Sequence, residues 1–232
     1  IIYAMDRFIQ TRELNKIIDG YSAPIRWYYS NTTSLDHPII KILMKRISIA
    51  APEQSPRFYD WFPKEIHGKD AVAYILDQGW NKPRDIVRLL IAAQNDSLHC
   101  NDTSFTQAAF DTLRKEYSKN SLTEIRQELQ SLYSSEEIEM VIRLLRGGSK
   151  ITTPEQIRKN AAKGSKARAF WDERCEDILE DFYRVGFWGN VNRNGEHFQW
   201  RWNHKGDTGV LTNNGWELAI HYALCNELSI MY

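Results

Sequence analysis

The spacing of hydrophobic residues predicts a chain built mainly from helices. Apolar residues recur every four positions from Leu35 to Ile47, which predicts a helix with one apolar face that starts near Asp36. The proline-rich segment 50–63 is expected to be a loop. Further helices are expected over residues 69–78, 84–94, 103–117, 121–133, 134–147, 154–162 and 170–183.

Capping patterns locate two of these helix starts. Ser121-Leu-Thr-Glu124 has the spacing at which a serine and a glutamate each accept a hydrogen bond from the other's backbone N–H group. A serine followed closely by glutamate also opens the next helix, at Ser134 or Ser135, which is expected to end at Gly147. The sequence therefore predicts separate helices starting at these two places.

The pattern changes near residue 185, after the last of these helices. Residues 185–189 are expected to be extended, and aromatic and polar residues alternate over His197–Asn203, which is typical of a strand. A short returning strand is expected over residues 209–211, and a helix, or a strand and a helix, over 216–228. Helices followed by a small hairpin are the elements of a winged helix. We therefore expect a mainly α chain, with a helical bundle followed by a winged-helix domain with a small β-hairpin.

Composition narrows the classes of function. The 232 residues contain 30 Lys and Arg and 30 Asp and Glu, so only a local patch could bind nucleic acid or an acidic membrane by charge. Three widely spaced cysteines indicate free thiols in a reducing compartment, and no apolar run is long enough to cross a bilayer. A cytoplasmic protein without a membrane partner is expected. Because the chain opens on Ile1-Ile2 without a methionine, we also expect it to be the later part of a longer protein.

No motif for catalysis is found in the chain. It lacks the Gly-x-x-x-x-Gly-Lys-Ser/Thr loop that cradles phosphates, and its six histidines do not pair with other residues at metal-ligand spacing. The acidic residues between Asp172 and Asp181 have the helical spacing of a solvated face. Neither catalytic residues, nor a metal site, nor a cofactor of this chain is therefore predicted.

Arg84 is the candidate for an anion contact. It follows Pro83 in the first turn of a predicted helix, where its charge opposes the helix macrodipole. An arginine in that position can be explained if it reaches an anion such as a nucleotide phosphate. The alternative is a salt bridge to Asp85 or to another acid, which local chemistry alone favours.

A family resemblance bears on Arg84. The sequence from Asn81 to Leu90 (Asn-Lys-Pro-Arg-Asp-Ile-Val-Arg-Leu-Leu) resembles the lid-helix signature of KAP- and STAND-like P-loop ATPases and of their AAA+ relatives. Segments within residues 1–49, 109–129, 182–190 and 221–224 resemble the later part of a group of bacterial P-loop ATPases.

The resemblance implies a nucleotide-sensing role for Arg84. In those families the arginine after the proline is the second sensor, which contacts the γ-phosphate of the nucleotide. It also implies that the partner is the N-terminal ATPase core of the same protein, which would bind ATP and Mg, and that the protein acts in bacterial signalling or anti-phage defence. Three parts are then expected: the end of the ATPase region and a linker (1–65), a helical lid (66–118) and a winged-helix-like C-terminal domain (119–232).

A basic patch is the second candidate site. Lys and Arg side chains contact nucleic-acid phosphates without regard to base sequence, and a winged helix commonly presents them. The alternative is internal pairing with the acidic helix over 172–181. The candidate DNA-binding residues are Arg158, Lys159, Lys163, Lys166, Arg168, Arg193, Arg201 and Lys205.

Three hypotheses remain open from the sequence. The first is a regulatory C-terminal module of a P-loop ATPase that couples the nucleotide state to the docking of a partner protein or DNA. The second is a winged-helix DNA-binding protein with a helical dimerisation module. The third is a non-catalytic protein-interaction scaffold, which predicts that Trp80, Trp188 or Trp202 lies in an exposed apolar patch.

Overall fold

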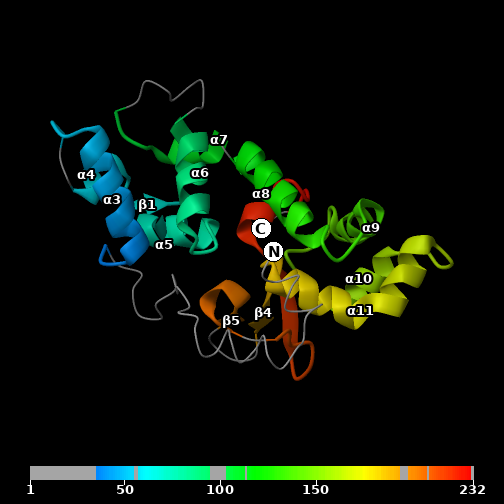
Figure 1. Ribbon diagram of the computed structural model, residues 1–232. Coiled ribbons are helices and arrows are strands. Elements are labelled where there is room, and N and C mark those ends of the chain that lie inside the picture. Colours follow the sequence, from blue (N-terminus) through cyan, green and yellow to red (C-terminus); the bar gives the residue numbers. More distant parts are fainter. Residues whose placement is uncertain are drawn as a thin grey trace, which may run out of the picture.

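The computed structural model describes residues 35–54, 57–94, 103–112, 114–193, 198–207 and 209–230. Most of this part is helical, as predicted, and it contains small antiparallel sheets (Figure 1). The helices are α3 (Pro38–Ala50), α4 (Phe58–Trp61), α5 (Ala71–Gln78), α6 (Pro83–Gln94), α7 (Gln107–Thr112), α8 (Arg114–Leu129), α9 (Ser135–Leu145), α10 (Pro154–Asn160) and α11 (Lys166–Arg184). The strands are β1 (Glu65–Ile66), β2 (Lys69–Asp70), β3 (Ile151–Thr152), β4 (Trp188–Asn192), β5 (Gln199–Arg201) and β6 (Trp216–Ile220), and the short 3-10 helices are η1 (Asn203–Lys205) and η2 (Tyr222–Leu224).

Some predictions fall on residues outside these ranges. One concerns residues 1–34, the first part of segment 1–65, which was expected to contain the end of an ATPase region and a linker. The other concerns His197, where the aromatic strand was expected to start. In the described part, no helix has a stretch long and apolar enough to span a bilayer. Cys175 and Cys225 are free thiols, while Cys100 lies outside the described residues.

Local sequence explains the start of α3. The His37 side chain accepts a hydrogen bond from the backbone N–H of Ile39 at 3.2 Å, and Pro38 occupies the first turn, where its missing N–H costs nothing. Segment 50–63, which we expected to be a loop, contains one helical turn, α4. There Phe58 is buried and stacks on Phe62 with ring centroids 4.5 Å apart. This apolar contact explains why that turn is ordered within a proline-rich segment.

The β1–β2 hairpin was not predicted. Its turn residues His67 and Gly68 both have positive φ, 53° and 71°, which matches the right-handed twist of the flanking strands. Asp70 ends the hairpin and caps α5, because its carboxylate accepts a hydrogen bond from the N–H of Ala73 at 3.1 Å.

The predicted helix start at Ser121 is wrong. Residue 121 lies inside α8, which runs without a break from Arg114 to Leu129, and the Ser121 side chain is buried. The helix expected over 103–117 is correspondingly replaced by α7 and the first turn of α8. The expected boundary between residues 118 and 119 also falls within α8, and the division into three parts stays a prediction.

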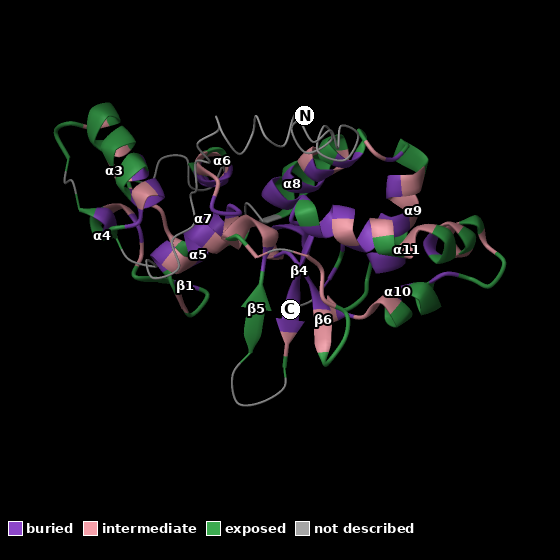
Figure 2. Cartoon of the chain, turned by 60° about the horizontal axis from the view of Figure 1, so that its bottom comes forward, coloured by how far each residue is buried: buried purple, intermediate pink, exposed green. Residues whose placement is uncertain are grey.

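The C-terminal elements have the order of a winged helix. Along the chain, α9 is followed by β3, then by α10 and α11, and then by β4 and β6. In the four-stranded antiparallel sheet β6 lies between β3 and β4, and β5 forms the edge beside β4. The strand expected over 209–211 is wrong, because β6 is the strand that returns to pair with β4. Figure 2 shows that β4 is buried whereas β5 is exposed.

One hydrophobic core joins the N-terminal helices to the winged helix. It extends from Ile39 of α3 to Ile230 after η2. Figure 1 shows α8 between the α5–α7 group and the α9–α11 group, and η2 packs on α8. The backbone N–H of Glu227 donates to the Ser118 hydroxyl at 2.8 Å, which fixes the C-terminal segment to α8. The two parts of the described chain therefore share their interior.

Candidate functional site

The turn before α6 is held by the winged helix. Trp80 and Asn81 adopt left-handed backbone conformations with φ of 46° and 51°. The Trp80 side chain is buried, its indole N–H donates to the Gly186 carbonyl at 2.8 Å, and its ring stacks on His221 with centroids 3.9 Å apart. The start of α6 is therefore positioned by residues more than a hundred positions further along the chain.

Two glycines make this close approach possible. A Cβ at Gly186 would lie 2.8 Å from two atoms of the Trp80 indole, and φ of 78° at this residue also favours glycine. A Cβ at Gly79 would lie 2.5 Å from the side chain of Ile86 on α6. The sequence identified Gly79 only as a helix stop, because its second role depends on packing across the turn.

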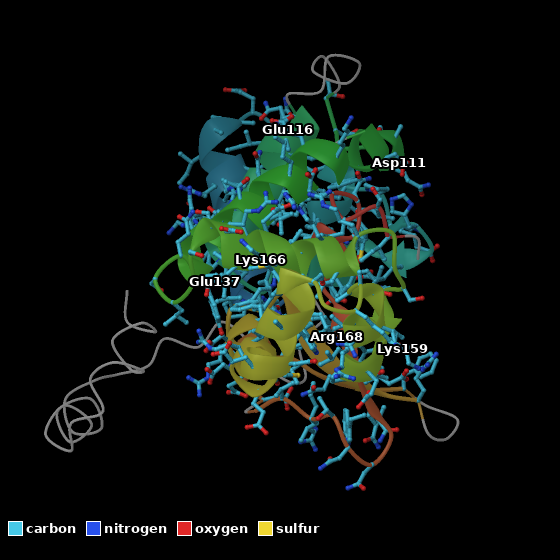
Figure 3. All side chains as sticks on the ribbon, turned by 90° about the vertical axis from the view of Figure 1, so that its right-hand side faces the viewer. Asp111, Glu116, Glu137, Lys159, Lys166 and Arg168 are labelled. Carbon is cyan, nitrogen blue, oxygen red and sulfur yellow. The ribbon has the colours of Figure 1, made fainter. Side chains whose placement is uncertain are left out.

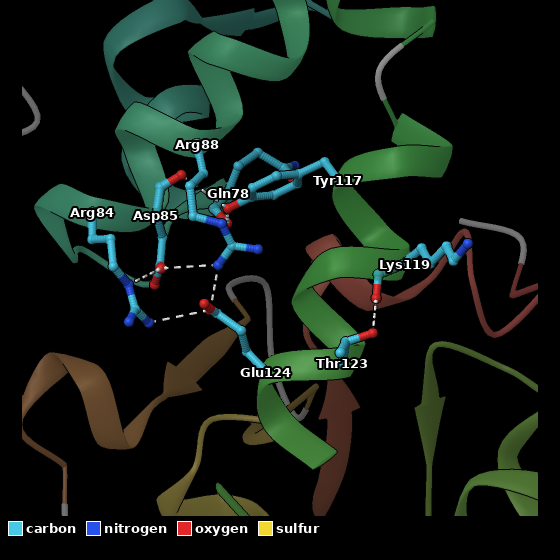
Figure 4. A network of polar contacts seen from close by, with 8 residues as sticks. All are labelled: Gln78, Arg84, Asp85, Arg88, Tyr117, Lys119, Thr123 and Glu124. Carbon is cyan, nitrogen blue, oxygen red and sulfur yellow. Dashed lines mark hydrogen bonds and ion pairs between the residues drawn. The ribbon is translucent and has the colours of Figure 1, made fainter. Parts of the chain in front are cut away.

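Arg84 belongs to an ion-pair network between α6 and α8 (Figure 4). Its Nη2 lies 3.2 Å from Oε2 of Glu124, and its Nε lies 3.5 Å from Oδ1 of Asp85. Arg88 forms an ion pair with the same Glu124 carboxylate. The structure thus shows the salt bridge that the sequence left open as the alternative. The Arg84 side chain is 66% exposed, and its nucleotide-sensing role stays a prediction.

Asp85 is the buried member of this network. Burial raises the pKa of its carboxyl group, and the charge of Glu124 adds to the rise, whereas Lys82, Arg84 and Arg88 oppose it. Within the Arg84, Asp85, Arg88 and Glu124 group, two guanidinium groups face two carboxylates, so the network is balanced in charge.

Tyr117 joins α8 to the end of α5 beside this network. Its hydroxyl donates to the Gln78 carbonyl at 2.9 Å, and burial raises its pKa. The surroundings of Arg84 are therefore fixed from α5, α6 and α8 at once.

Several residues of the predicted DNA-binding patch are paired with acids. Nε and Nη2 of Arg158 lie 2.6 Å and 2.9 Å from the two carboxylate oxygens of Asp172, and Nε of Arg168 lies 3.3 Å from the same group. Arg193 makes a two-pronged contact with Glu217 at 2.6 Å and 2.8 Å. These three guanidinium groups are thus largely neutralised within the chain.

The other wing residues also have internal contacts. Nζ of Lys205 lies 3.3 Å from Asp77, and the Arg201 guanidinium lies over the Trp216 ring, 5.1 Å from its centroid.

The three lysines at α10 and the start of α11 differ from these wing residues. Lys159, Lys163 and Lys166 are exposed, and within the described ranges no carboxylate forms an ion pair with them. In Figure 3, Lys159 and Lys166 lie on the side formed by α10 and α11. The structure does not bring the eight predicted residues together as one free basic surface.

The exposed aromatic residues differ from those that the scaffold hypothesis predicts. Trp80, Trp188 and Trp202 are all buried. Phe198, just before the edge strand β5, and Trp200 within it are 60% and 36% exposed instead. The apolar patch named by that hypothesis is therefore not formed by its three tryptophans.

Two histidines lie beside the Trp80 contact. His221 is a hydrogen-bonded core residue, as predicted, since its Nδ1 accepts from the backbone N–H of Ala223 at 3.3 Å. Its ring centroid is 5.6 Å from that of His204. Burial lowers the pKa of His204 to about 3 and that of His221 well below its usual value, and Lys205 adds to both effects. Both rings are therefore neutral at pH 7.

The fold and these contacts define a helical domain, from α3 to α8, joined through a common core to a winged helix, from α9 to η2. Residues 37–126 match the protein family described as the FunZ-associated C-terminal helical domain. The match begins at His37, the cap of α3, and ends within α8. No match was found among curated proteins or among solved structures. The family match covers the helical domain alone, and the relation to STAND and KAP ATPases stays a prediction.

Proposed function

We propose that the chain is a non-catalytic regulatory module of a P-loop ATPase, in which the helical domain and the winged helix move as one body. The observation that carries this proposal is the burial of Trp80, which precedes α6, against Gly186 and His221 of the winged helix. Because interiors are close-packed, a rotation of α6 would carry the winged helix with it. A change sensed at the start of α6 would thereby alter what the winged helix docks against.

Arg84 is the proposed sensor of the nucleotide. Its contact with Glu124 is an exposed ion pair, and such pairs contribute only about 0–1 kcal/mol. A γ-phosphate presented by an adjoining ATPase domain offers more negative charge and more acceptor oxygens, so it would replace Glu124 as the partner. ATP would then favour one of two arrangements because it binds that arrangement more tightly.

Two further points support a module of this kind. The family that residues 37–126 match is described as a C-terminal helical domain, which agrees with a domain that follows another one. The lid-helix resemblance around Arg84 supplies the nucleotide part of the proposal, and with it a role in bacterial signalling or anti-phage defence. The chain itself would bind no ATP or Mg; these would be held by the ATPase core.

The test measures ATP affinity in the protein that contains both this chain and its ATPase domain. Arg84→Ala should weaken ATP binding about tenfold or more, because a hydrogen bond to a charged group contributes about 1.5–3 kcal/mol. Arg143→Ala is the matched control, since Arg143 is 73% exposed and forms a similar ion pair on α9. Equal ATP affinity in the Arg84→Ala and Arg143→Ala proteins would refute the sensor.

DNA binding by the winged helix is the second candidate function. Its supporting observation is the group Lys159, Lys163 and Lys166, which lies where α10 leads into α11 and has no acidic partner within the described residues. Exposed acids further along α11, Glu173 and Glu176 among them, would repel the phosphate backbone. The candidate therefore rests on contacts at the start of α11 only.

A salt titration of binding to a DNA duplex tests this candidate. Replacing the three lysines by alanine should reduce the slope of log K against log salt concentration by about 3, since each phosphate contact contributes about 0.9. Absence of binding by the unmodified chain at low ionic strength would eliminate DNA as the partner.

A further inference from the structure

A cavity of about 310 Å³ lies at the junction of the helical domain and the winged-helix part. The β1–β2 hairpin and α5 supply most of its wall, and Tyr222 of η2 supplies the rest. Its polar lining includes His67, Lys69, Asp77 and Tyr222. The volume is at the lower end of the roughly 300–1,000 Å³ of ligand pockets, which suits a small ligand.

Two lysines share Asp77, the one carboxylate among the described residues that line this cavity. Lys69, from β2, forms an ion pair with Oδ2 of Asp77, and Nζ of Lys205, from η1, lies 3.3 Å from Oδ1 of the same residue. Burial alone would raise the pKa of Asp77, but Lys205 and Lys69 outweigh burial and lower it. Asp77 is therefore ionised at pH 7 and still carries only half the charge of the two ammonium groups.

A third lysine, Lys150, contacts the ring of Tyr222. Nζ of Lys150 lies 3.0 Å from the centroid of the Tyr222 ring. Burial, with a smaller contribution from Lys69, lowers the pKa of Lys150 to about 8, although Cys225 and Asp77 act in the opposite direction. The neighbouring thiol of Cys225 is neutral at pH 7, because burial raises its pKa to about 11. Asp111 is the next carboxylate, and its Oδ1 lies 3.1 Å from Nε2 of the lining residue His67. Among the described residues, the three lysines Lys69, Lys150 and Lys205 therefore outnumber the two carboxylates around the cavity.

We propose that this cavity is an anion site that binds a phosphate group between the helical domain and the winged helix. Lys69 would contact the phosphate directly, and the Tyr222 hydroxyl would be a further donor. Lys150 and Lys205, which do not line the cavity, would attract the phosphate by charge at longer range. The site is separate from Arg84, which does not line the cavity, and it requires no ATPase domain. A bound phosphate would bridge β2 and η2, and so stabilise the junction between the two parts.

Calorimetric titration of the chain with inorganic phosphate, at constant ionic strength, tests the proposal. Two substitutions in the cavity should change the affinity for phosphate in opposite directions. Lys69→Met should weaken phosphate binding about tenfold or more, by loss of one charged hydrogen bond. Asp77→Asn should tighten binding, because it removes the negative charge that Lys69 and Lys205 share, and no other described lining residue is a carboxylate. Lys119→Met, which removes an exposed lysine of α8, should leave binding unchanged.

A general loss of structure would weaken phosphate binding in both cavity variants, so tightening by Asp77→Asn identifies a charge effect. If circular dichroism shows that Asp77→Asn does not fold, the test is the difference in phosphate affinity between Lys69→Met and Lys119→Met. Absence of saturable binding, equal effects of those two lysine variants, or weaker binding by folded Asp77→Asn would overturn the proposal.

A second titration, with adenosine monophosphate, identifies the source of the phosphate. Tighter binding than that of inorganic phosphate would support a phosphate carried by a nucleotide. Equal or weaker binding, with phosphate itself bound, would support free phosphate.

Discussion

Replacing Trp80 by alanine should destabilise the helical domain and the winged helix together. Trp80 is only 6% exposed, and it contacts Gly186 and His221 from the other side of the junction. Truncation of a buried tryptophan to alanine costs about 3–5 kcal/mol. Because native domains are stable by only about 5–15 kcal/mol, this is a large part of the total. Trp80→Phe should cost less, about 1–3 kcal/mol, since it keeps a ring but leaves the Gly186 carbonyl without its donor.

The assay is urea unfolding followed by circular dichroism, combined with hydrogen exchange of backbone amides in α6 and β4. A loss of 3 kcal/mol or more in the free energy of unfolding makes hydrogen exchange at least about a hundredfold faster for those amides that exchange only through global unfolding. Since the two parts share one core, the exchange rates in α6 and β4 should rise by the same factor. Trp200→Ala is the matched control, because Trp200 lies on the edge strand and is 36% exposed, so its loss should cost less than about 1 kcal/mol.

Faster exchange in α6 with unchanged exchange in β4 would contradict this reasoning. It would mean that the helical domain unfolds independently and that the contacts of Trp80 do not couple it to the winged helix. The same result would remove the basis of the proposed regulatory module, whatever Arg84 contacts.

Three other predictions concern stability. Because the pKa values of His204 and His221 are lowered in the fold, their contribution to stability is fully present above about pH 6.5, and it is lost progressively as the pH falls from there toward the folded pKa, which is about 3 for His204. Each of these two histidines should contribute about 2 kcal/mol to the difference in stability between pH 7 and pH 5 in urea unfolding, and equal stability at both pH values would contradict their burial as neutral rings. Ser134→Ala should cost about 1 kcal/mol in thermal unfolding, since it removes the side-chain half of the α9 capping box, and an unchanged midpoint would show the cap to be dispensable. Gly189→Ala should cost about 1–3 kcal/mol, because its Cβ would lie 2.5 Å from the Trp202 ring, and full stability of this variant would show that β4 can shift.

The sequence predicted those elements whose ends are set by neighbouring residues. The α9 start at Ser134 and the α10 start at Thr153 each have a capping box formed within four residues of chain. The spacing Ser121–Glu124 looks the same, yet no helix begins there. In α8 the Glu124 carboxylate pairs with Arg88 and Arg84 of α6, and Ser121 is buried. A capping pattern cannot be told from a helix interior until the partners of its acid are known.

The candidate site was less predictable because its charges are balanced by distant residues. Arg84 pairs with Glu124, forty positions away, and Arg193 pairs with Glu217 on a neighbouring strand. Lys205 and Asp77 are separated by 128 positions. A count of basic residues along the chain therefore overstated the free positive charge of the wing. The hairpin turn at His67 was missed for a different reason, because a histidine at positive φ gives little signal in the sequence.

The burial of Trp80 restricts how the helical domain can be combined with other domains. The matched region 37–126 contains this tryptophan, but Gly186 and His221, which cover it, lie outside that region. A protein that fuses the same helices to a different C-terminal partner must therefore cover the indole with a new surface or carry a smaller residue at this position. Grafting residues 37–126 onto an unrelated carrier would leave a large apolar ring in water, and the hybrid would tend to aggregate.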